Sequence, residues 1–381
     1  SGFSALRREG IELTSAFTAN VNADLRVGNL AETITVSGQA PAVDTQNVIQ
    51  QKVVTRGLLD SLPSGRTFTA LAALVPGAVV SGSSAGAGGN QDVGGSAGST
   101  NVALAIHGGR AGDQQLFLDG MRFNNILGQA GGGAFTIYLN TASVQEVSLT
   151  TDHASAESEQ GGIRMNIIPK EGGNRFTGYF FTDFTNNSLQ SDNLTAELRA
   201  RGITAASGID KIWDINPAVG GPILKDKLWF YTAHRWWGSG KYVAGLYYNK
   251  DPQAWTYTPD LSRQAVDDQH QQASNLRLTW QVSPKHKVTV FGNPQSQCWC
   301  HFGISGGTSS PEAVPKHEVM PAYVVQARWS APITSRLLLE AGLSYNTCDP
   351  HFTPVDGATL NTISVLELST NFLYRGPNTI A

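Results

Sequence analysis

The chain changes its sequence pattern near residue 174, and this change constrains the fold more than any other feature. Before it, residues 144–173, VQEVSLTTDHASAESEQGGIRMNIIPKEGG, are rich in glycine and end in one alternating strand, IRMNII, that stops at Pro169. After it, aromatic and polar residues alternate, as in RFTGYFFTDF. Strict alternation predicts strands with two chemically different faces. We therefore expect a glycine-rich globular segment followed by long amphipathic strands.

The alternation continues to the end of the chain and favours a membrane β-barrel over a soluble β-sandwich, which also alternates. In residues 275–282, NLRLTWQV, apolar side chains share one face and Arg277 lies on the other. Residues 323–329 and 336–345 repeat this pattern, which places Arg328 and Glu340 in mid-strand. A sandwich core avoids such charges, whereas the polar lumen of a barrel accepts them. Trp229, Phe230, Trp236 and Trp237 suggest an interfacial girdle.

Loop lengths support the same interpretation. Short turns at residues 283–285 and 331–334 are expected to join consecutive strands, while the long polar stretches 239–272 and 294–320 are expected to separate the pairs. Short turns at one end and long loops at the other are typical of outer-membrane barrels.

Composition excludes several classes of protein. Only 15% of residues are charged, against about 25% in a typical soluble domain, and glycine is frequent. The net charge of −3 gives no reason to expect a nucleic-acid partner. No apolar run reaches the roughly 18 residues of a transmembrane helix, and residues 1–10 have no apolar core of a signal peptide.

The first 174 residues read as two different segments. Residues 11–13 and 17–27 predict two strands, and residues 40–47 a linker. Residues 54–62 and 67–75 have helical spacing, and residues 81–100 form a glycine-rich tract that cannot bury a core. Short strands are expected at residues 102–106, at 144–149, and at 115–118 before an Asp119–Gly120 turn.

Three motifs in order resemble the TonB-dependent outer-membrane receptors. IHGGRAGDQQLFLDGMRFNN (106–125) and GGIRMNIIPKEGG (161–173) are similar to plug elements, and INPAVGGPILKDKLWFYTAHRW (215–236) to the early barrel hairpin of the Oar-type receptors. The resemblance implies a mainly β fold, with a mixed α/β plug domain followed by the first strands of a transmembrane antiparallel β-barrel. It assigns residues 1–38 to the end of a carboxypeptidase-regulatory-like β-sandwich with a TonB-box-like segment, 39–174 to the plug and 175–381 to a partial barrel. The plug-motif residues are Asp119, Gly120, Gly161, Gly162 and Asn166.

The segment ETITVSG resembles a TonB box, formed here by Glu32, Thr33, Ile34, Thr35 and Val36. Such a box must leave the receptor and add as a strand to the edge of the TonB sheet, which β-branched residues favour. The alternative is the last strand of the sandwich. The resemblance implies a Gram-negative bacterial outer-membrane location, a TonB-type energy-coupling partner, contact with outer-membrane lipid, and uptake of an oligosaccharide, a peptide or a metal chelate.

The resemblance also suggests ion pairs between plug and barrel. Arg110 and Arg164, in plug strands, are candidates to pair with Glu340 of the barrel. A solvated or structural role is the alternative for either arginine.

The barrel predicted here is too small to close. The residues after Asn174 suffice for about eight to ten strands, whereas large outer-membrane transporters have about 22. We therefore expect a fragment of a receptor, truncated at both ends.

Other chemistry finds little support in the sequence. Cys298, Cys300 and His301 form a C-x-C-H pattern, which lacks the two-residue gap of common zinc sites, so we expect no metal or other cofactor. A disulfide with Cys348, or free thiols, is favoured instead. No nucleophile elbow, phosphate loop or zinc-protease motif occurs, and the chain is not expected to be an enzyme. Two alternatives to a receptor remain: a non-transporting, adhesin-like surface protein, and an enzyme or metal-binding protein that uses the Cys298–His301 loop.

Overall fold

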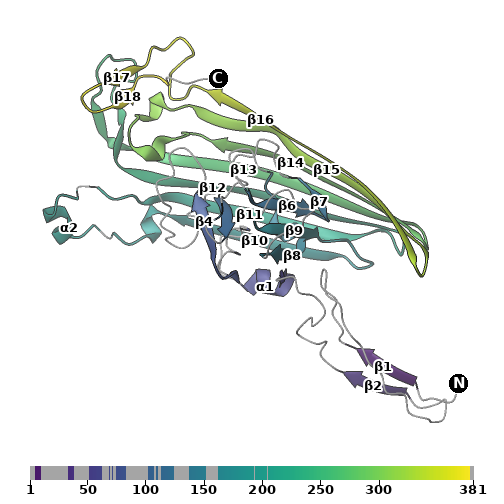
Figure 1. Cartoon of the computed structure of the whole chain (residues 1–381). Helices are drawn as coiled ribbons and strands as arrows, with labels where there is room; N and C mark the ends of the chain where they lie inside the picture. Colours follow the sequence, from purple (N-terminus) through teal and green to yellow (C-terminus); the bar gives the residue numbers. More distant parts are fainter. Residues whose placement is uncertain are drawn as a thin grey trace.

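The computed structural model of the chain describes residues 5–9, 33–37, 51–61, 68, 71, 74–82, 102–106, 109, 113–123, 137–151, 162–192, 194–203 and 205–377. Two sheets dominate these residues. A seven-stranded antiparallel sheet, which we call the wall, follows the chain order β10 to β16, and a five-stranded sheet, which we call the inner sheet, has the order β3-β8-β9-β6-β7. The inner sheet lies against one face of the wall (Figure 1).

The wall is built entirely from consecutive hairpins. Each strand pairs with the next strand along the chain, because antiparallel neighbours need no crossover connection. Its strands are β10 (Thr177–Asn186), β11 (Ile209–Leu224), β12 (Leu228–Asn249), β13 (Pro259–Ser283), β14 (His286–Trp299), β15 (Lys316–Thr334) and β16 (Leu337–Thr353). Neighbouring strands are held in register over most of their lengths.

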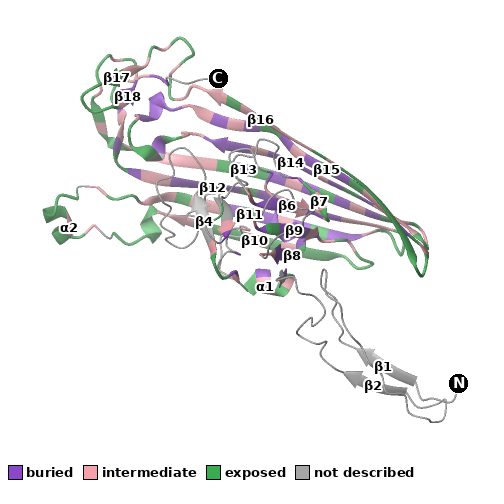
Figure 2. Ribbon diagram, in the orientation of Figure 1, coloured by how far each residue is buried: buried purple, intermediate pink, exposed green. Residues whose placement is uncertain are grey.

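The two faces of the wall have the polarity of a membrane barrel. On β13, Asn275, Arg277 and Thr279 are buried toward the inner sheet, while Leu276 and Trp280 on the opposite face are each 45% exposed. Figure 2 shows this alternation of buried and exposed residues along the wall strands. Polar residues inside and apolar residues outside are the reverse of a soluble sandwich and are typical of a barrel whose outer face meets lipid. The predicted fold class is confirmed.

The strands are longer than expected, and this corrects two predicted loops. Residues 239–272 and 294–320 were expected to be long polar connections, but most of the first stretch belongs to β12 or β13, and the two ends of the second belong to β14 and β15. The connections themselves are residues 250–258 and 300–315. Backbone hydrogen bonds to both neighbours extend a strand even where neither face is apolar, so side-chain polarity gave no signal for these ends. Within the described residues the wall has seven strands, against the eight to ten expected, and β17 (Val365–Glu367) and β18 (Phe372–Tyr374) pair separately.

The predicted girdle is also divided between the two faces. Trp236 is exposed on the outer face and Phe230 is half-buried there, but Trp237 is buried toward the inner side. Trp229 donates its indole hydrogen to Asn174 at 2.8 Å.

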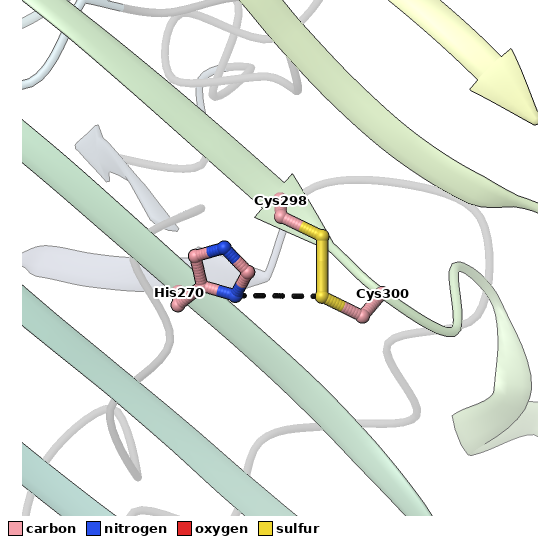
Figure 3. A group of neighbouring side chains, drawn as sticks. All are labelled: His270, Cys298 and Cys300. Carbon is pink, nitrogen blue, oxygen red and sulfur yellow. Dashed lines mark hydrogen bonds between the residues drawn. A yellow bond between two sulfur atoms is a disulfide. The ribbon is translucent and has the colours of Figure 1, made fainter.

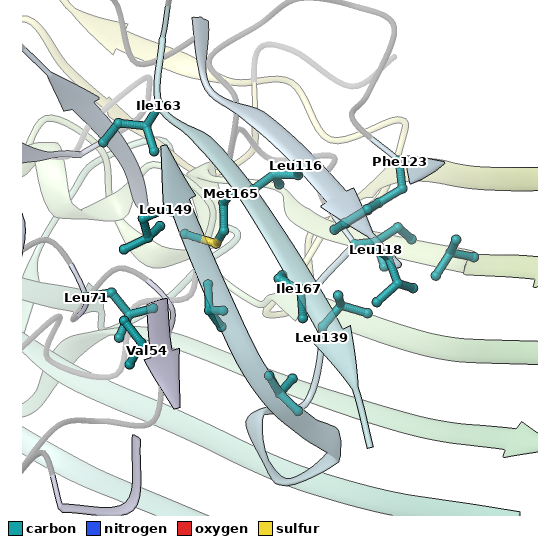
Figure 4. Close-up of a cluster of buried hydrophobic side chains, with 14 of the residues drawn as sticks. Val54, Leu71, Leu116, Leu118, Phe123, Leu139, Leu149, Ile163, Met165 and Ile167 are labelled. Atoms are coloured by element: carbon teal, nitrogen blue, oxygen red, sulfur yellow. The ribbon is translucent and has the colours of Figure 1, made fainter. Parts of the chain in front are cut away.

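The inner sheet has an apolar core of its own. Its strands are β3 (Gln51–Thr55), β6 (Gln115–Leu118), β7 (Met121–Arg122), β8 (Val144–Thr150) and β9 (Arg164–Pro169). Val54, Leu118, Leu149, Met165 and Ile167 are almost completely buried and gather on one side of it (Figure 4). The same cluster includes Phe291 and Val324 of the wall, so the two sheets share apolar packing.

The remaining elements are small. Helix α1 (Arg56–Ser61) lies within the predicted helix 54–62, and β4 (Ala78–Gly82) pairs with β5 (Val102–Ile106). Helix α2 (Ala196–Ala200) lies in the connection between β10 and β11. The predicted strands 11–13 and 17–27 lie outside the described residues. Among the residues that are described, no helix has the length and apolar character needed to cross a membrane.

Candidate functional site

A tight turn at the end of β6 carries the first group of the site. Asp119 and Gly120 both have positive φ, 53° and 80°, a conformation that asparagine, aspartate and glycine adopt most readily. The Gly120 amide donates to Oδ1 of Asn166 on β9 at 3.0 Å, which fixes the turn to the strand that pairs with β6. The structure therefore brings together three of the predicted plug-motif residues.

The carboxylate on this turn reaches the wall. Arg277 of β13 donates through Nη1 to Oδ2 of Asp119 at 2.8 Å. Arg328 of β15 approaches the other carboxylate oxygen at 3.8 Å. Because Arg277 is only 5% exposed, its charge needs a partner of opposite sign in the same buried space.

A second carboxylate completes the contact from the chain just after β9. Glu171 accepts a hydrogen bond from Nη2 of Arg277 at 2.9 Å, and its other oxygen lies 2.8 Å from Nζ of Lys287 on β14. Burial alone would raise the pKa of Glu171, but Lys287 and Arg277 outweigh it, and the pKa is lowered. We call Asp119, Glu171, Arg277 and Lys287 the charge clamp; its acids belong to the inner side and its bases to the wall.

Neutral hydrogen bonds continue the contact along residues 137–143. The side-chain amides of Asn140 and of Asn216 on β11 bond to each other in both directions, at 2.8 and 2.9 Å. Gln295 of β14 accepts from the Tyr138 amide at 3.0 Å, and Tyr231 of β12 donates to the Ala142 carbonyl at 3.0 Å. Three wall strands therefore hold this one segment through groups that carry no net charge.

The chain leaves the inner sheet through a close backbone contact. A Cβ atom built at Gly172 would lie 2.3 Å from the Phe230 carbonyl oxygen of β12, whereas one at Gly173 would meet nothing within 4 Å. Only glycine lets the two backbones approach this closely.

Replacing Gly172 with alanine is therefore expected to lower the free energy of unfolding by about 1–3 kcal/mol, the usual cost of a forced steric clash. The matched change Gly173→Ala should alter it by less than about 0.5 kcal/mol. Urea unfolding of detergent-solubilised protein, followed by tryptophan fluorescence, measures both. Equal effects of the two substitutions would contradict the close approach at Gly172.

The predicted arginine partners are arranged differently. The structure does not bring Arg164 and Glu340 together: the guanidinium of Arg164 lies 4.1 Å from the centre of the Phe117 ring, and Glu340 pairs with Arg328 at 2.5 Å. Arg110 lies outside the described residues. The ion pairs that do join the inner sheet to the wall have the opposite polarity, because here the buried cation belongs to the wall.

Other predicted site residues lie as follows. Gly161 is outside the described residues, and a Cβ at Gly162 would meet the Asp113 carbonyl oxygen at 2.2 Å. Of the TonB-box-like segment, Thr33, Ile34, Thr35 and Val36 lie in β2 (Thr33–Ser37), which pairs in parallel with β1 (Ala5–Glu9). Glu32 is outside the described residues.

Sequence reasoning missed the acidic half of the charge clamp. Arg277 was recognised as a charge on the polar face, but Asp119 was assigned to a turn and to the plug motif without an ionic partner, and Glu171 had no role. One signal in the sequence could have indicated these acids: an arginine in the middle of a buried strand face needs an acidic partner. Nothing in one sequence indicates which acid, more than a hundred residues away, supplies it.

The structure also separates the residues of the C-x-C-H pattern. Cys298 and Cys300 form a disulfide with each other, and Cys348 is a free, half-buried thiol, which corrects the expected disulfide with Cys348. Cys298 and Cys300 are two residues apart, so their sulfur atoms meet locally, whereas a bond to Cys348 would need two separate strands to bring the cysteines together. His301 points away from this pair: its Nδ1 lies 2.6 Å from Asp268 and its Nε2 2.7 Å from Asp356.

His301 thus joins β13 to the chain beyond β16 at the long-loop end of the wall. Burial alone would lower the pKa of His301, but hydrogen bonds to Asp268 and Asp356 outweigh it and raise the pKa from 6.5 to about 9. Tyr248 packs its ring edge against the imidazole. The charged imidazole is therefore stabilised by the fold.

This contact predicts a pH dependence of stability. The stabilisation is fully present below pH 6.5 and is lost as the pH rises through about 9, because only the folded state keeps the proton in that range. We expect the free energy of unfolding to fall by roughly 2 kcal/mol across this window. Urea unfolding at several pH values measures it. The variant His301→Gln should lack this slope, and an identical slope in the variant would contradict the assignment.

Comparisons with known proteins agree with this geometry. No protein-family model matches the chain. In sequence it is similar to the TonB-dependent transporter Oar of Myxococcus xanthus, with 26% identity over 242 residues that cover 60% of this chain and 20% of that protein.

Solved receptors have the same fold. The siderophore receptor PirA from Acinetobacter baumannii matches with a TM-score of 0.55 and 15% identity, over 87% of this chain and 42% of that one. The outer membrane transporter YddB from Escherichia coli matches with a TM-score of 0.57 and 12% identity, over 80% and 39%. A ferric enterobactin receptor mutant (PfeA) from Pseudomonas aeruginosa matches with a TM-score of 0.54 and 13% identity, over 85% and 44%.

The sequence similarity to Oar and the fold shared with the solved receptors agree with the resemblance to TonB-dependent outer-membrane receptors that the three sequence motifs carry. The chain spans one fifth of the length of the Oar transporter. The relatives are transporters and receptors and not enzymes, in agreement with the prediction from sequence.

Proposed function

We propose that the chain supplies the plug and part of the barrel wall of a receptor that takes up its substrate with energy from a TonB-type partner. The proposed division is residues 1–38 for the sandwich end and TonB box, 39–174 for the plug, and 175–381 for the barrel. The observation that carries the proposal is the charge clamp, because it holds the inner sheet against the polar face of a wall whose other face is apolar.

The clamp suits a plug that is held firmly but is able to move. Arg277 is satisfied by two carboxylates from two different segments, Asp119 and Glu171. In buried pairs of this kind, the free energy lost when the charges are desolvated offsets much of their Coulomb attraction. When water enters, each charge regains its hydration, so the net cost of separating the pairs is far below their gross attraction. A pulling force at the N-terminal side is thus able to release the plug without unfolding the wall.

The pulling point we propose is the TonB-box-like segment. Its described part, Thr33–Val36, is already an extended strand, paired along one edge with β1. A TonB-type protein would take this strand onto the edge of its own sheet, where main-chain hydrogen bonds supply the affinity. The competition between β1 and the partner for one strand would make the box available only part of the time.

Binding of the purified C-terminal domain of a TonB protein tests this assignment. Ile34→Pro removes a backbone donor and disfavours strand pairing, and we expect it to weaken binding at least about tenfold, which corresponds to about 1.4 kcal/mol. Ala40→Pro, just outside the box, should bind as the unchanged chain does. Calorimetric titration against the full chain in detergent measures all three. Equal binding by the Ile34→Pro variant would overturn the assignment of the box.

The substrate we propose is one too large for simple pores, with oligosaccharides, peptides and metal chelates as the classes. The solved relatives include proteins named as siderophore and ferric enterobactin receptors, which supports testing metal chelates first. Equilibrium binding of a panel from each class to the full chain in detergent distinguishes these classes. Retention of none of them would contradict substrate recognition by this part of a receptor.

A further inference from the structure

A row of metal-binding residue types crosses four strands on the outward face of the wall. The register places His270 of β13 beside Cys298 of β14, Cys298 beside Glu318 of β15, and Glu318 beside His351 of β16. Directly paired residues have Cβ atoms about 4.5–5.5 Å apart and point to the same face. Their chain neighbours Gln271, Gln297 and His317 are buried toward the other side of the wall. The row is therefore separate from the charge clamp.

The chain returns to this row immediately after β14 ends. Cys300 folds back onto it, and its Sγ lies 3.5 Å from Nδ1 of His270. One ligand atom from each of His270, Cys298 and Cys300 lies within 4.8 Å of the others. Figure 3 shows the imidazole directed at the two sulfur atoms, which are joined in a disulfide. His270 is exposed and Cys300 half-buried, whereas Cys298 is only 3% exposed, so the disulfide is reachable from outside through Cys300.

Once the disulfide is reduced, the same three residues have a different chemistry. Two thiolates and one imidazole are the ligands that zinc and other thiophilic divalent ions prefer, and a carboxylate oxygen is an accepted fourth ligand in a tetrahedral site. Glu318 is the neighbour of Cys298 in register, and within the described part of the chain its carboxylate pairs with Lys316 at 2.9 Å, near the surface. If this pair separates, water solvates the ammonium group of Lys316 at little cost in free energy, so Glu318 is able to turn toward the sulfur atoms.

We propose that Cys298, Cys300, His270 and Glu318 form a redox-gated site for a zinc-like divalent cation at the long-loop end of the wall. A small dithiol opens it by thiol–disulfide exchange: two electrons and two protons pass to the Cys298–Cys300 pair, and the dithiol becomes its own disulfide. The cation then displaces the two thiol protons. In the oxidised state neither sulfur is a thiolate, so the site is closed.

Two neighbouring residues are excluded from the site and serve as controls. His301 has both ring nitrogens within 2.7 Å of carboxylates on Asp268 and Asp356. Cys348 packs against the apolar core that the wall shares with the inner sheet. The proposed ligands therefore differ from the C-x-C-H pattern of the sequence, because His270 from the adjacent strand replaces His301.

Cobalt titration of the full chain in detergent tests the proposal, with Cys348→Ser as the background so that two thiols remain. After reduction and removal of the dithiol without air, we expect about one equivalent of Co²⁺ with a sulfur-to-metal charge-transfer band, displaced by Zn²⁺. The air-oxidised sample of the same protein should show no such band. His270→Ala should weaken binding at least about tenfold, as removal of one ligand does, while His301→Ala should bind unchanged.

Two outcomes would overturn the proposal. One is a reduced sample that binds no more cobalt than the Cys298→Ser, Cys300→Ser variant. The other is an oxidised sample that binds as tightly as the reduced one. The comparison of oxidised with reduced protein needs no substitution in the row, so it does not depend on the folding of any ligand variant. A reduced sample that binds equally in the His270→Ala variant would remove His270 from the site.

Discussion

Replacing Arg277 with glutamine is expected to lower the free energy of unfolding by about 3 kcal/mol, the lower end of the cost of breaking a buried ion pair. The substitution removes the cation from Asp119, whose side chain is only 11% exposed, and from Glu171, whose side chain is 36% exposed. Lys287 still pairs with Glu171, and Arg328 still lies 3.8 Å from Asp119, which keeps the loss from being larger. Urea unfolding in detergent measures the change.

Arg328 provides the matched control on the next strand but one. Its main partner is Glu340, and the side chains of this pair are 38% and 44% exposed. Exposed pairs contribute about 0–1 kcal/mol, so Arg328→Gln should cost less than about 1 kcal/mol. If both arginines proved equally dispensable, the charge clamp would not hold the inner sheet against the wall.

A second large effect is expected inside the wall itself. Asp214 of β11 accepts from Arg235 of β12 through both oxygens, at 2.6 to 3.1 Å, and both residues are only 4% exposed. The guanidinium also lies 4.5 Å from the centre of the Trp237 ring. Asp214→Ala removes the bidentate partner of a buried cation, and we expect a loss of about 3–5 kcal/mol.

The exposed pair of Glu197 in α2 with Arg201, the residue that follows the helix, tests whether burial makes the Asp214–Arg235 pair strong. Glu197 and Arg201 are paired at 2.5 Å, but both side chains are more than two thirds exposed. Glu197→Ala should therefore cost no more than about 0.5 kcal/mol. The two variants differ in burial far more than in charge chemistry, so similar losses in urea unfolding would show that burial is not what makes the Asp214–Arg235 pair strong.

The sequence predicted those parts of the fold that depend on local pattern. The two faces of residues 275–282, the strand Arg164–Pro169 and the Asp119–Gly120 turn all follow from alternation or from turn chemistry. Each of these signals lies within about ten neighbouring residues, where side-chain period and backbone preference act directly. They were sufficient to distinguish an inverted barrel wall from a soluble sandwich.

What the sequence did not predict depends on register between distant strands. The extent of β13 into polar residues follows from hydrogen bonds to β12 and β14. The pairing of Asp119 with Arg277 joins residues 158 positions apart. The meeting of His270 with Cys298 also arises only from strand register. A single sequence contains the charges and the ligands, but the fold decides which of them meet.

A double-mutant cycle across the clamp tests the central claim most directly. Asp119→Asn suits the positive φ at this position, and Arg277→Gln keeps most of the side-chain shape. If Asp119 and Arg277 hold the inner sheet to the wall, the unfolding free energies should show a coupling of about 1–3 kcal/mol. If the two effects instead add within about 0.3 kcal/mol, the residues do not interact, and the docking of the inner sheet on the wall would be contradicted.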